Sequence, residues 1–511
     1  MCARSGQRRS HHDHRLGTLS IMKKASILLV TSNGTGMGHL TRQSSIARAL
    51  GTDADVFILS MSAGITVLDQ SEFRTEFLPS YQKRWMPRRD WHQYLRQRIV
   101  ALAREIQADV ICFDGVAPYE GLIRSRSDLP QTAFVWFRRG LWRPGTNLPA
   151  LRSAPFFDLI IEPGDLGQSR DQGPTKDLAA ARIAPVSLLD VLDTCDRDEA
   201  RLALGLPTEG KIALVSLGSG AVGLDAELRE AACAHVLDQG WQVATTQAIL
   251  EGSMSAANGV HVLQRIYPLA RYIKAFDLVV SAAGYNAVHE FVPAGIPSVF
   301  VPNTHTSTDD QVARAQGCHD AGLAEWSHPD VGIAGLTAAI DQAITNSAQI
   351  SQTIQRRAAG ARGSQEAAAL LLKLATTFGT DHPSLPTRAK RNQFLWQQDG
   401  KRLLRSLVST KIIPARRKIA EPADLLEVNL EISLESMPSG VVADSTTAES
   451  SPNSDGQLTL RQTSELTTDL VQGSDPFEHI SPNTSLAYWQ ERTAILHRFY
   501  RIKSTSMSTR K

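Results

Sequence analysis

One histidine in this sequence stands where a catalytic base could act. His39 closes the segment NGTGMGH, between an apolar run at residues 26–31 and a helical pattern at residues 40–50. A glycine-rich turn from a strand into a helix presents backbone N–H groups to an anionic or oxygen-rich ligand. The positive end of the helix dipole also lowers the pKa of an imidazole there, so we expect His39 to be a neutral proton acceptor. The alternative is a histidine that only caps or packs at the helix end.

A carboxylate is predicted to lie close to this histidine. Asp114 follows the apolar run DVICF, and ligands of open parallel sheets bind beyond the carboxyl ends of the strands. A carboxylate at this place could hold the imidazole in the tautomer that accepts a proton. The alternative is a plain turn residue within Asp114-Gly115.

Two later glycine positions could cradle a diphosphate. Gly218, Ser219 and Gly220 follow the apolar run KIALVS, and Gly284 opens a predicted helix directly after the run DLVVS. Small residues in such turns let backbone N–H groups approach phosphate oxygens. Both turns are therefore candidate phosphate contacts.

Polar side chains downstream of Gly284 could hold a sugar. Glu290 lies six residues further on, under two turns into the helix, where a carboxylate can bridge two vicinal hydroxyls. Asp310 and Gln311 offer acceptor oxygens and an amide to the rim of a sugar.

Several other classes of site are disfavoured. The second predicted strand, residues 54–60, ends without the acid that a dinucleotide-binding unit uses for ribose, and the sequence has no GxxxxGK phosphate loop. The pair Asp53 and Asp55 has metal-binding spacing, but it precedes a strand, so we expect no metal. Five cysteines without CxxC spacing indicate a reducing compartment and no zinc or disulfide framework.

Two series of strand–helix alternation position these residues. β-Branched apolar runs predict buried parallel strands at 26–31, 54–60, 109–113, 132–137 and 158–161, and again at 211–216, 242–246, 261–263, 277–281 and 298–302. The predicted fold class is α/β, with two doubly wound Rossmann-like domains facing each other across a cleft, plus a largely disordered C-terminal extension.

Charge is uneven along the 511 residues although the net charge is only +2. Residues 388–418 hold ten Lys or Arg and one acid, whereas residues 436–486 hold seven acids and one Arg among many Ser, Thr and Pro. The predicted division is a disordered leader at 1–21, an N-terminal acceptor-side domain at 22–165, a linker at 166–208, a donor-binding domain at 209–378, a basic extension at 379–435, a disordered acidic tail at 436–486, and a segment at 487–511 that could form an amphipathic basic helix. No run reaches the length of a membrane span, and no apolar segment follows the basic N-terminus, so we expect a cytoplasmic protein.

Taken together, GxGxGH, GSG, GxNxxxE, GxP and DQ resemble the motifs of GT-B glycosyltransferases over residues 24–375. The sequence looks closest to the family 28 relatives of the transferase that adds N-acetylglucosamine to lipid I. The resemblance implies a base at His39 with Asp114 as its partner, and a donor site in which Ile266 reads the uracil edge, Asn286 joins the glycine positions at the phosphates, Glu290 binds ribose, and Asp310 and Gln311 bind the transferred sugar. The sequence departs from the related plant branch at Ala282 and Ala287, where that branch has histidine and serine, and extra residues, including His305, separate Pro302 from Asp310.

The implied function is inverting, metal-independent transfer of a sugar, such as an N-acetylhexosamine or a hexose, from a UDP-sugar to a hydroxyl of a lipid-linked or cell-envelope glycan, without a cofactor. Gly36, Gly38 and Arg42 are expected in the acceptor-side loop, and their segment also looks like the GxGHxxR of hydrolases that remove UDP from amino-sugar precursors. A UDP-sugar hydrolase, a sugar-nucleotide 2-epimerase and a non-catalytic scaffold therefore remain alternatives.

Basic–aromatic stretches at residues 83–91 and 134–143 lie in the acceptor-side domain. Tryptophan beside clustered arginine suits an anionic membrane surface or a lipid-phosphate acceptor, which predicts peripheral contact with the inner face of the cell membrane. A solvated face is the alternative. No nucleic-acid partner is expected, because no reader motif is present.

Overall fold

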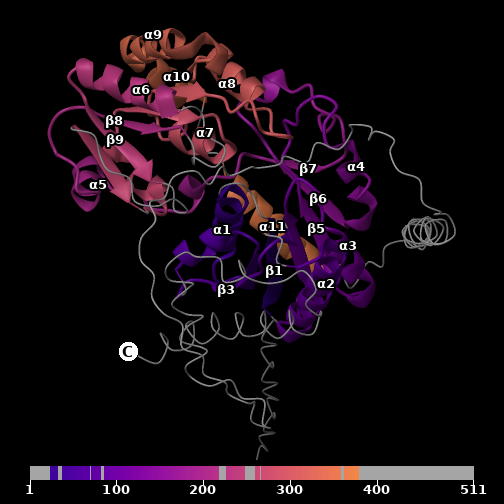
Figure 1. Ribbon diagram of the computed structural model, residues 1–511. Coiled ribbons are helices and arrows are strands. Elements are labelled where there is room, and N and C mark those ends of the chain that lie inside the picture. Colours follow the sequence, from indigo (N-terminus) through magenta and orange to yellow (C-terminus); the bar gives the residue numbers. More distant parts are fainter. Residues whose placement is uncertain are drawn as a thin grey trace, which may run out of the picture. The chain divides into compact units, whose positions relative to one another are not determined.

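The computed structural model describes residues 24–378, except for 33–36, 70, 82–85, 218–225, 248–258, 265 and 358–361. The predicted leader, basic extension, acidic tail and terminal segment all lie outside the described residues. Figure 1 shows the described part as two groups of strands with their helices.

The first domain is built on a seven-stranded parallel sheet of order β3-β2-β1-β4-β5-β6-β7. Its strands are β1 (Ala25–Thr31), β2 (Ala54–Ser60), β3 (Arg74–Phe77), β4 (Val110–Asp114), β5 (Ala133–Phe137), β6 (Leu159–Pro163) and β7 (Ala181–Ile183). The helices up to the second domain are α1 (Gly38–Leu50), α2 (Arg88–Glu105), α3 (Glu120–Ser125), α4 (Leu148–Leu151) and α5 (Arg197–Ala203). The central strands are apolar runs buried on both faces, which is what a sheet covered on both sides requires.

The second domain repeats this plan with the order β10-β9-β8-β11-β12-β13. Its strands are β8 (Ile212–Ser216), β9 (Gln242–Gln247), β10 (Val260–Gln264), β11 (Leu278–Ala282), β12 (Ser298–Val301) and β13 (Glu325–Trp326). Its helices are α6 (Ala226–Asp238), α7 (Tyr285–Phe291), α8 (Gln311–Asp320), α9 (Gly332–Thr345) and α10 (Ser347–Arg357), and α11 (Gly363–Thr377) ends the described chain. The predicted fold class, with two doubly wound α/β domains, is confirmed.

Each sheet has a point where the strand order reverses, which is where ligands of such sheets bind. In the first sheet this point lies between β1 and β4, and Thr31 pairs with Asp114 in the parallel register. In the second sheet it lies between β8 and β11. The predicted base follows β1, and the predicted donor turns follow β8 and β11, so the candidate residues lie at both reversal points.

Two segments belong to other parts of the fold than the predicted domain boundaries assigned them to. The predicted linker contains β7, which pairs with β6 as the outer strand of the first sheet. Helix α11, predicted as part of the donor domain, packs on the first domain, where it is drawn in orange beside α1 in Figure 1. Leu371 is fully buried in the first domain's core. At the start of α11, a Cβ on Gly363 would lie 2.2 Å from the carbonyl oxygen of Ala184, so this close approach requires glycine.

Candidate active site

His39 and Asp114 are in direct contact, as predicted from their places after two strands. His39 is the second residue of α1, and Asp114 is the last residue of β4. The His39 Nδ1 atom lies 2.6 Å from Asp114 Oδ1. The aspartate side chain is 1% exposed and the histidine side chain is 12% exposed, so the pair is almost withdrawn from water.

Arg42 completes this group from the next turn of α1. Its Nε donates to Asp114 Oδ2 at 3.0 Å and its Nη2 donates to Oδ1 at 2.8 Å. Nη2 also lies 2.8 Å from His39 Nδ1, but a nitrogen that donates to Asp114 cannot accept from Arg42 as well. The close carboxylate favours the tautomer with hydrogen on Nδ1, which leaves Nε2 as the proton acceptor.

Burial and charge set the protonation states of this group. Burial lowers the pKa of His39 below 6.5, and the positive charges of Arg42 and Arg139 act in the same direction, while Asp114 opposes them. Burial alone would raise the pKa of Asp114, but Arg42 and His39 more than offset this and hold it below its usual value. At neutral pH the arrangement is therefore a neutral imidazole on an ionised carboxylate, which is the form of a general base.

The predicted donor motif lies on β11 and α7. Gly284 precedes the first turn of α7, and a Cβ built on it would meet no heavy atom within 4 Å. Asn286 also contacts the first domain, because its Nδ2 donates to the carbonyl oxygen of Gly38 at 3.3 Å. Ile266 packs partly buried against one face of the second sheet. Helix α7 thus contacts the residue immediately before His39.

Glu290 differs from every other carboxylate of the site. It makes no hydrogen bond or ion pair with any side chain among the described residues, and burial raises the pKa of its carboxyl to about 8. A part-buried carboxylate without donors is costly to ionise. This is the state expected of a group whose hydrogen-bond donors arrive with a ligand.

Four predicted residues lie outside the described part of the chain. They are Gly36 in the first glycine turn and Gly218, Ser219 and Gly220 in the second. Their proposed contacts stay predictions.

Asp310 and Gln311 stand at the start of α8 and are engaged within the protein. Asp310 caps the helix, since its Oδ1 accepts from the backbone N–H of Ala313 at 3.0 Å. Gln311 Oε1 accepts from the backbone N–H of Asn303 at 2.9 Å. A role in holding the transferred sugar stays a prediction. Side chains with that role would bind the sugar while they also make these hydrogen bonds within the protein.

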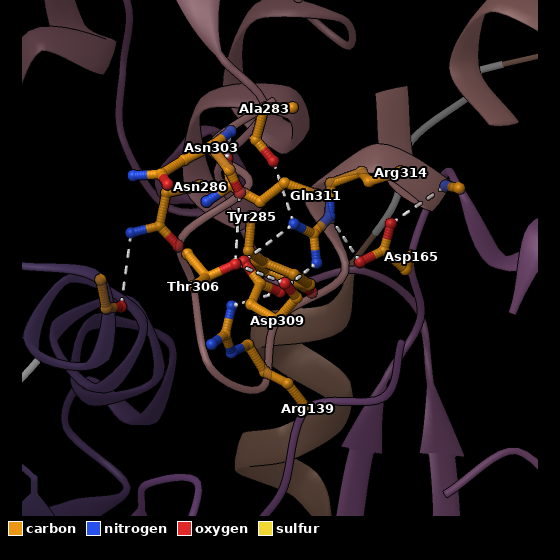
Figure 2. A network of polar contacts seen from close by, with 12 residues as sticks. Arg139, Asp165, Ala283, Tyr285, Asn286, Asn303, Thr306, Asp309, Gln311 and Arg314 are labelled. Atoms are coloured by element: carbon orange, nitrogen blue, oxygen red, sulfur yellow. Dashed lines mark hydrogen bonds and ion pairs between the residues drawn. The ribbon is translucent and has the colours of Figure 1, made fainter. Parts of the chain in front are cut away.

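One polar network of the site was not predicted. Arg314 on α8 is fully buried, and it donates to Asp165 of the first domain at 2.8 Å and to Asp309 at 2.7 and 3.1 Å (Figure 2). Arg139, after β5, reaches the same Asp309 at 3.2 Å. Tyr285 lies in the middle and donates its hydroxyl to the carbonyl oxygen of Gly164. The Arg314–Asp165 and Arg139–Asp309 bonds join residues 149 and 170 positions apart, so no local pattern could reveal them; only the place of Asp309 beside Asp310 hinted at one member.

The basic–aromatic stretch at 134–143 does not form a membrane-facing surface. Trp136 and Trp142 are 0% and 2% exposed, and Arg138 is 1% exposed and paired with Glu162 at 2.8 Å. The reason is that the stretch is strand β5 and its continuation, so its aromatic residues fill the core. In the stretch at 83–91, residues 83–85 lie outside the description, and Trp91 is fully buried.

The extra residues after Pro302 form a loop held on the first domain. The backbone N–H of Arg143 donates to the carbonyl oxygen of Thr308 at 2.8 Å, and Asp309 forms an antiparallel bridge with Trp142. Within the loop, the backbone N–H of His305 donates to Asn303 Oδ1 at 2.8 Å. A contact of the His305 ring with a substrate stays a prediction.

The described residues lack two structural features. They contain no group of three or more His, Cys, Asp or Glu placed to hold a metal ion. They also contain no helix with both the length and the apolar character needed to cross a bilayer.

The structure has the GT-B class of fold that the sequence predicted, with two Rossmann-like domains. A histidine–aspartate pair lies at the reversal point of the first sheet, and the glycine turn before α7 lies at that of the second. Residues 225–371 match the glycosyltransferase family 28 C-terminal domain. The matched range includes the predicted donor residues from Ile266 to Gln311.

The curated relatives that the chain resembles share one name, UDP-N-acetylglucosamine--N-acetylmuramyl-(pentapeptide) pyrophosphoryl-undecaprenol N-acetylglucosamine transferase. The protein from Leuconostoc citreum is 33% identical over 92 residues, which are 18% of this chain and 25% of the relative. The one from Salinibacter ruber is 32% identical over 145 residues, which are 26% of this chain and 38% of the relative. The chain thus spans well under half the length of these relatives.

Solved structures with a similar chain trace include the glycotransferase of kitacinnamycin, at 16% identity and a TM-score of 0.49, with 69% of this chain and 99% of that chain covered. Acinetobacter baumannii MurG is similar at 15% identity and a TM-score of 0.46, with 68% of this chain and 99% of that chain covered.

Proposed function

We propose that this protein is an inverting glycosyltransferase that moves a sugar from a UDP-sugar to a hydroxyl of a lipid-linked or cell-envelope glycan. The observation that carries the proposal is the contact between the two halves of the site: Asn286, in the donor helix α7, donates to the carbonyl oxygen of Gly38, the neighbour of His39. A base and a donor-binding helix in this relation suit an attack of an acceptor hydroxyl on a bound sugar.

In the proposed reaction His39 Nε2 removes the proton of the acceptor hydroxyl. The oxygen attacks the anomeric carbon from the side opposite the diphosphate, the bond to the diphosphate breaks, and the configuration inverts. Asp114 holds the imidazole by its Nδ1–H and stabilises the positive charge that forms on it. The N-terminal turn of α7 and the glycine turn at 218–220 would stabilise the negative charge of the leaving diphosphate. We propose that these amides perform this role without a metal ion and without a cofactor.

The names of the relatives support the choice of substrates. They specify UDP-N-acetylglucosamine as the donor and a pyrophosphoryl-undecaprenol acceptor for those proteins. By analogy we propose an N-acetylhexosamine or a hexose as the transferred sugar and a lipid-linked phosphate acceptor, reached from the cytoplasmic face of the membrane. Co-sedimentation with anionic liposomes that weakens with added salt tests the membrane part, and no binding at low salt would contradict it.

A donor panel with a membrane extract tests the activity. UDP release together with a glycosylated product supports transfer, and NMR of the product reports the anomeric configuration. UDP release at the same rate without any acceptor would identify the hydrolase instead. Absence of saturable UDP binding would favour the non-catalytic scaffold. An unchanged rate in EDTA is expected for a metal-independent reaction.

A further inference from the structure

Arg139 stands between the two halves of the site with few partners. It follows strand β5 of the first domain, and its side chain is 14% exposed. Its Nη1 donates to Asp309 Oδ1 at 3.2 Å, and its guanidinium carbon lies 6.0 Å from the centre of the Tyr285 ring (Figure 2). Asp309 is its one hydrogen-bond partner among the described residues.

The neighbouring carboxylates are already engaged by other groups. Asp114 accepts two bonds from Arg42 and contacts His39, and Asp309 accepts two bonds from Arg314. The Nε–H of Arg139 is buried and has no partner among the described residues. An arginine keeps its charge in a protein, so this guanidinium is a buried cation with incomplete compensation.

The Tyr285 ring lies between the predicted base and this cation: its centre is 5.3 Å from the guanidinium carbon of Arg42, which contacts His39, and 6.0 Å from that of Arg139. The positive charge of Arg139 lowers the pKa of His39, and burial lowers the pKa of Arg139 itself despite the opposite effect of Asp309. Both effects arise when a charged group stands in a poorly hydrated site without enough counter-charge. A substrate anion beside His39 would supply that charge.

We propose that Arg139 is a substrate-binding residue that contacts a phosphate oxygen of a substrate beside His39. The inference rests on the proposed function, since it deepens the chemistry of the same site. A planar guanidinium with free N–H groups is suited to phosphate recognition. Two substrates carry this chemistry: the diphosphate of the sugar donor and the phosphate of a lipid-linked acceptor.

The experiment measures the binding of inorganic pyrophosphate, UDP and uridine to the full-length protein by calorimetry. The variants are Arg139→Gln, which removes the charge, Arg139→Lys, which keeps it, and Arg152→Gln as a control. Arg152 is an exposed arginine of the same domain for which no side-chain partner is found among the described residues. Thermal melting establishes that each variant is folded.

We expect Arg139→Gln to weaken pyrophosphate binding at least tenfold, Arg139→Lys to recover part of the loss, and Arg152→Gln to stay within twofold of the wild type. A donor contact weakens UDP binding and leaves uridine binding unchanged. An acceptor contact leaves UDP binding unchanged and raises the KM for the acceptor. Pyrophosphate binding by Arg139→Gln within twofold of the wild type overturns the proposal.

A measurement on the wild type covers the case in which Arg139→Gln does not fold. Phenylglyoxal modifies accessible arginines, and mass spectrometry follows each site separately. We expect pyrophosphate to protect Arg139, and equal modification with and without pyrophosphate overturns the proposal. The binding of pyrophosphate is measured independently of catalysis. If the protein transfers no sugar but needs Arg139 to bind pyrophosphate, the proposed function is wrong and the anion contact is supported.

Discussion

The two carboxylates that matter most in this site are in opposite states. Asp114, beside the predicted base, is saturated by hydrogen bonds from Arg42 and His39, and its pKa lies below the usual value. Glu290, in the donor helix, has no hydrogen-bond donor among the described residues, and its pKa is raised to about 8. We propose that the difference reflects two roles: Asp114 orients the base before the substrate arrives, whereas Glu290 forms its hydrogen bonds with the substrate's hydroxyls.

Physical chemistry gives a reason for this division. A general base works only if its imidazole is held in one tautomer and one direction before proton transfer. Its partner must therefore be bonded in the free protein. A ribose-binding carboxylate gains most when its bonds form only with the ligand, because a bonded carboxylate would have to lose those partners first.

The largest expected effect concerns the pre-bonded pair. His39→Ala should lower turnover about 10²–10⁴-fold, because proton removal by a placed base contributes about that much. Donor binding should stay within about twofold, since the imidazole serves the acceptor. Steady-state kinetics and calorimetry with the UDP-sugar measure the two quantities.

His235→Ala is the matched control, because His235 also contacts an aspartate, at 2.7 Å from Asp341, but lies on α6 of the donor domain. Its activity should equal that of the wild type. Near-full activity of His39→Ala would show that His39 is not the base. Asp114 would then have no catalytic role to contrast with that of Glu290.

The next effect concerns Glu290, the carboxylate proposed to bind the donor's ribose. Glu290→Gln should weaken UDP-sugar binding about 10- to 100-fold, since hydrogen bonds to a charged group contribute about 1.5–3 kcal/mol. A donor that lacks the ribose 2′-hydroxyl should bind the wild type more weakly but should bind Glu290→Gln with little further loss. The exposed Glu230, replaced by Gln, serves as the control.

If the two changes weakened binding additively, the carboxylate and the hydroxyl would not be in contact. The raised pKa of Glu290 would then reflect its burial and no contact with ribose.

The pH dependence of donor binding sharpens the same comparison. Glu290 is protonated below its pKa of about 8 in the free protein, and hydroxyl donors favour its ionised form, so binding below that pH must release a proton. Affinity for the UDP-sugar should therefore rise with pH, by up to about tenfold per unit well below pH 8, and level off above it. Calorimetry at several pH values, in buffers of different ionisation enthalpy, measures both the affinity and the released proton. A flat profile in the wild type, equal to that of Glu290→Gln, would contradict the assignment.

The smallest effect concerns Asp310, whose side chain accepts a hydrogen bond from the backbone of α8. Its carboxylate caps α8, so Asp310→Ala should cost about 0.5–2 kcal/mol of unfolding free energy, and Asp310→Asn should cost much less because asparagine also caps helices. Denaturant unfolding of both variants measures this. A loss of activity in Asp310→Asn without a loss of stability would indicate that the side chain binds the sugar. If activity falls only as far as stability falls in both variants, the side chain acts only as the helix cap.

Much of the fold could be predicted from local patterns. Apolar runs such as DVICF and SVFVP mark buried parallel strands, and the structure places β4 and β12 there. The strands missed were β3, β7 and β13, of four, three and two residues, because so short a run carries no period of its own. Helix α11 was assigned to the wrong domain, because an apolar face does not specify which sheet will cover it.

The candidate site divides in the same way. His39 and Asp114 could be paired from the sequence, because each follows a central strand and parallel strands end at one edge. The burial of Arg139 could not be predicted, since a run of basic and aromatic residues has the same pattern on a surface and in a core. The pairing of Arg314 with Asp165 could not be predicted either, because 149 positions separate the two residues. Tertiary packing decided that the aromatic residues fill the first domain and that the arginines are buried beside carboxylates.

The sequence by itself predicted the two α/β domains and the places of His39, Asp114 and Glu290 in them, because the alternation of strands and helices follows from local patterns along the chain. Only the tertiary structure decided what each of these groups meets. The burial that lowers the pKa of His39, the lack of hydrogen-bond donors to Glu290 among the described residues, and the ion pairs from Arg314 to Asp165 and Asp309 depend on how distant parts of the chain pack. Desolvation and long-range charge are properties of that packing, and no spacing along the chain encodes them.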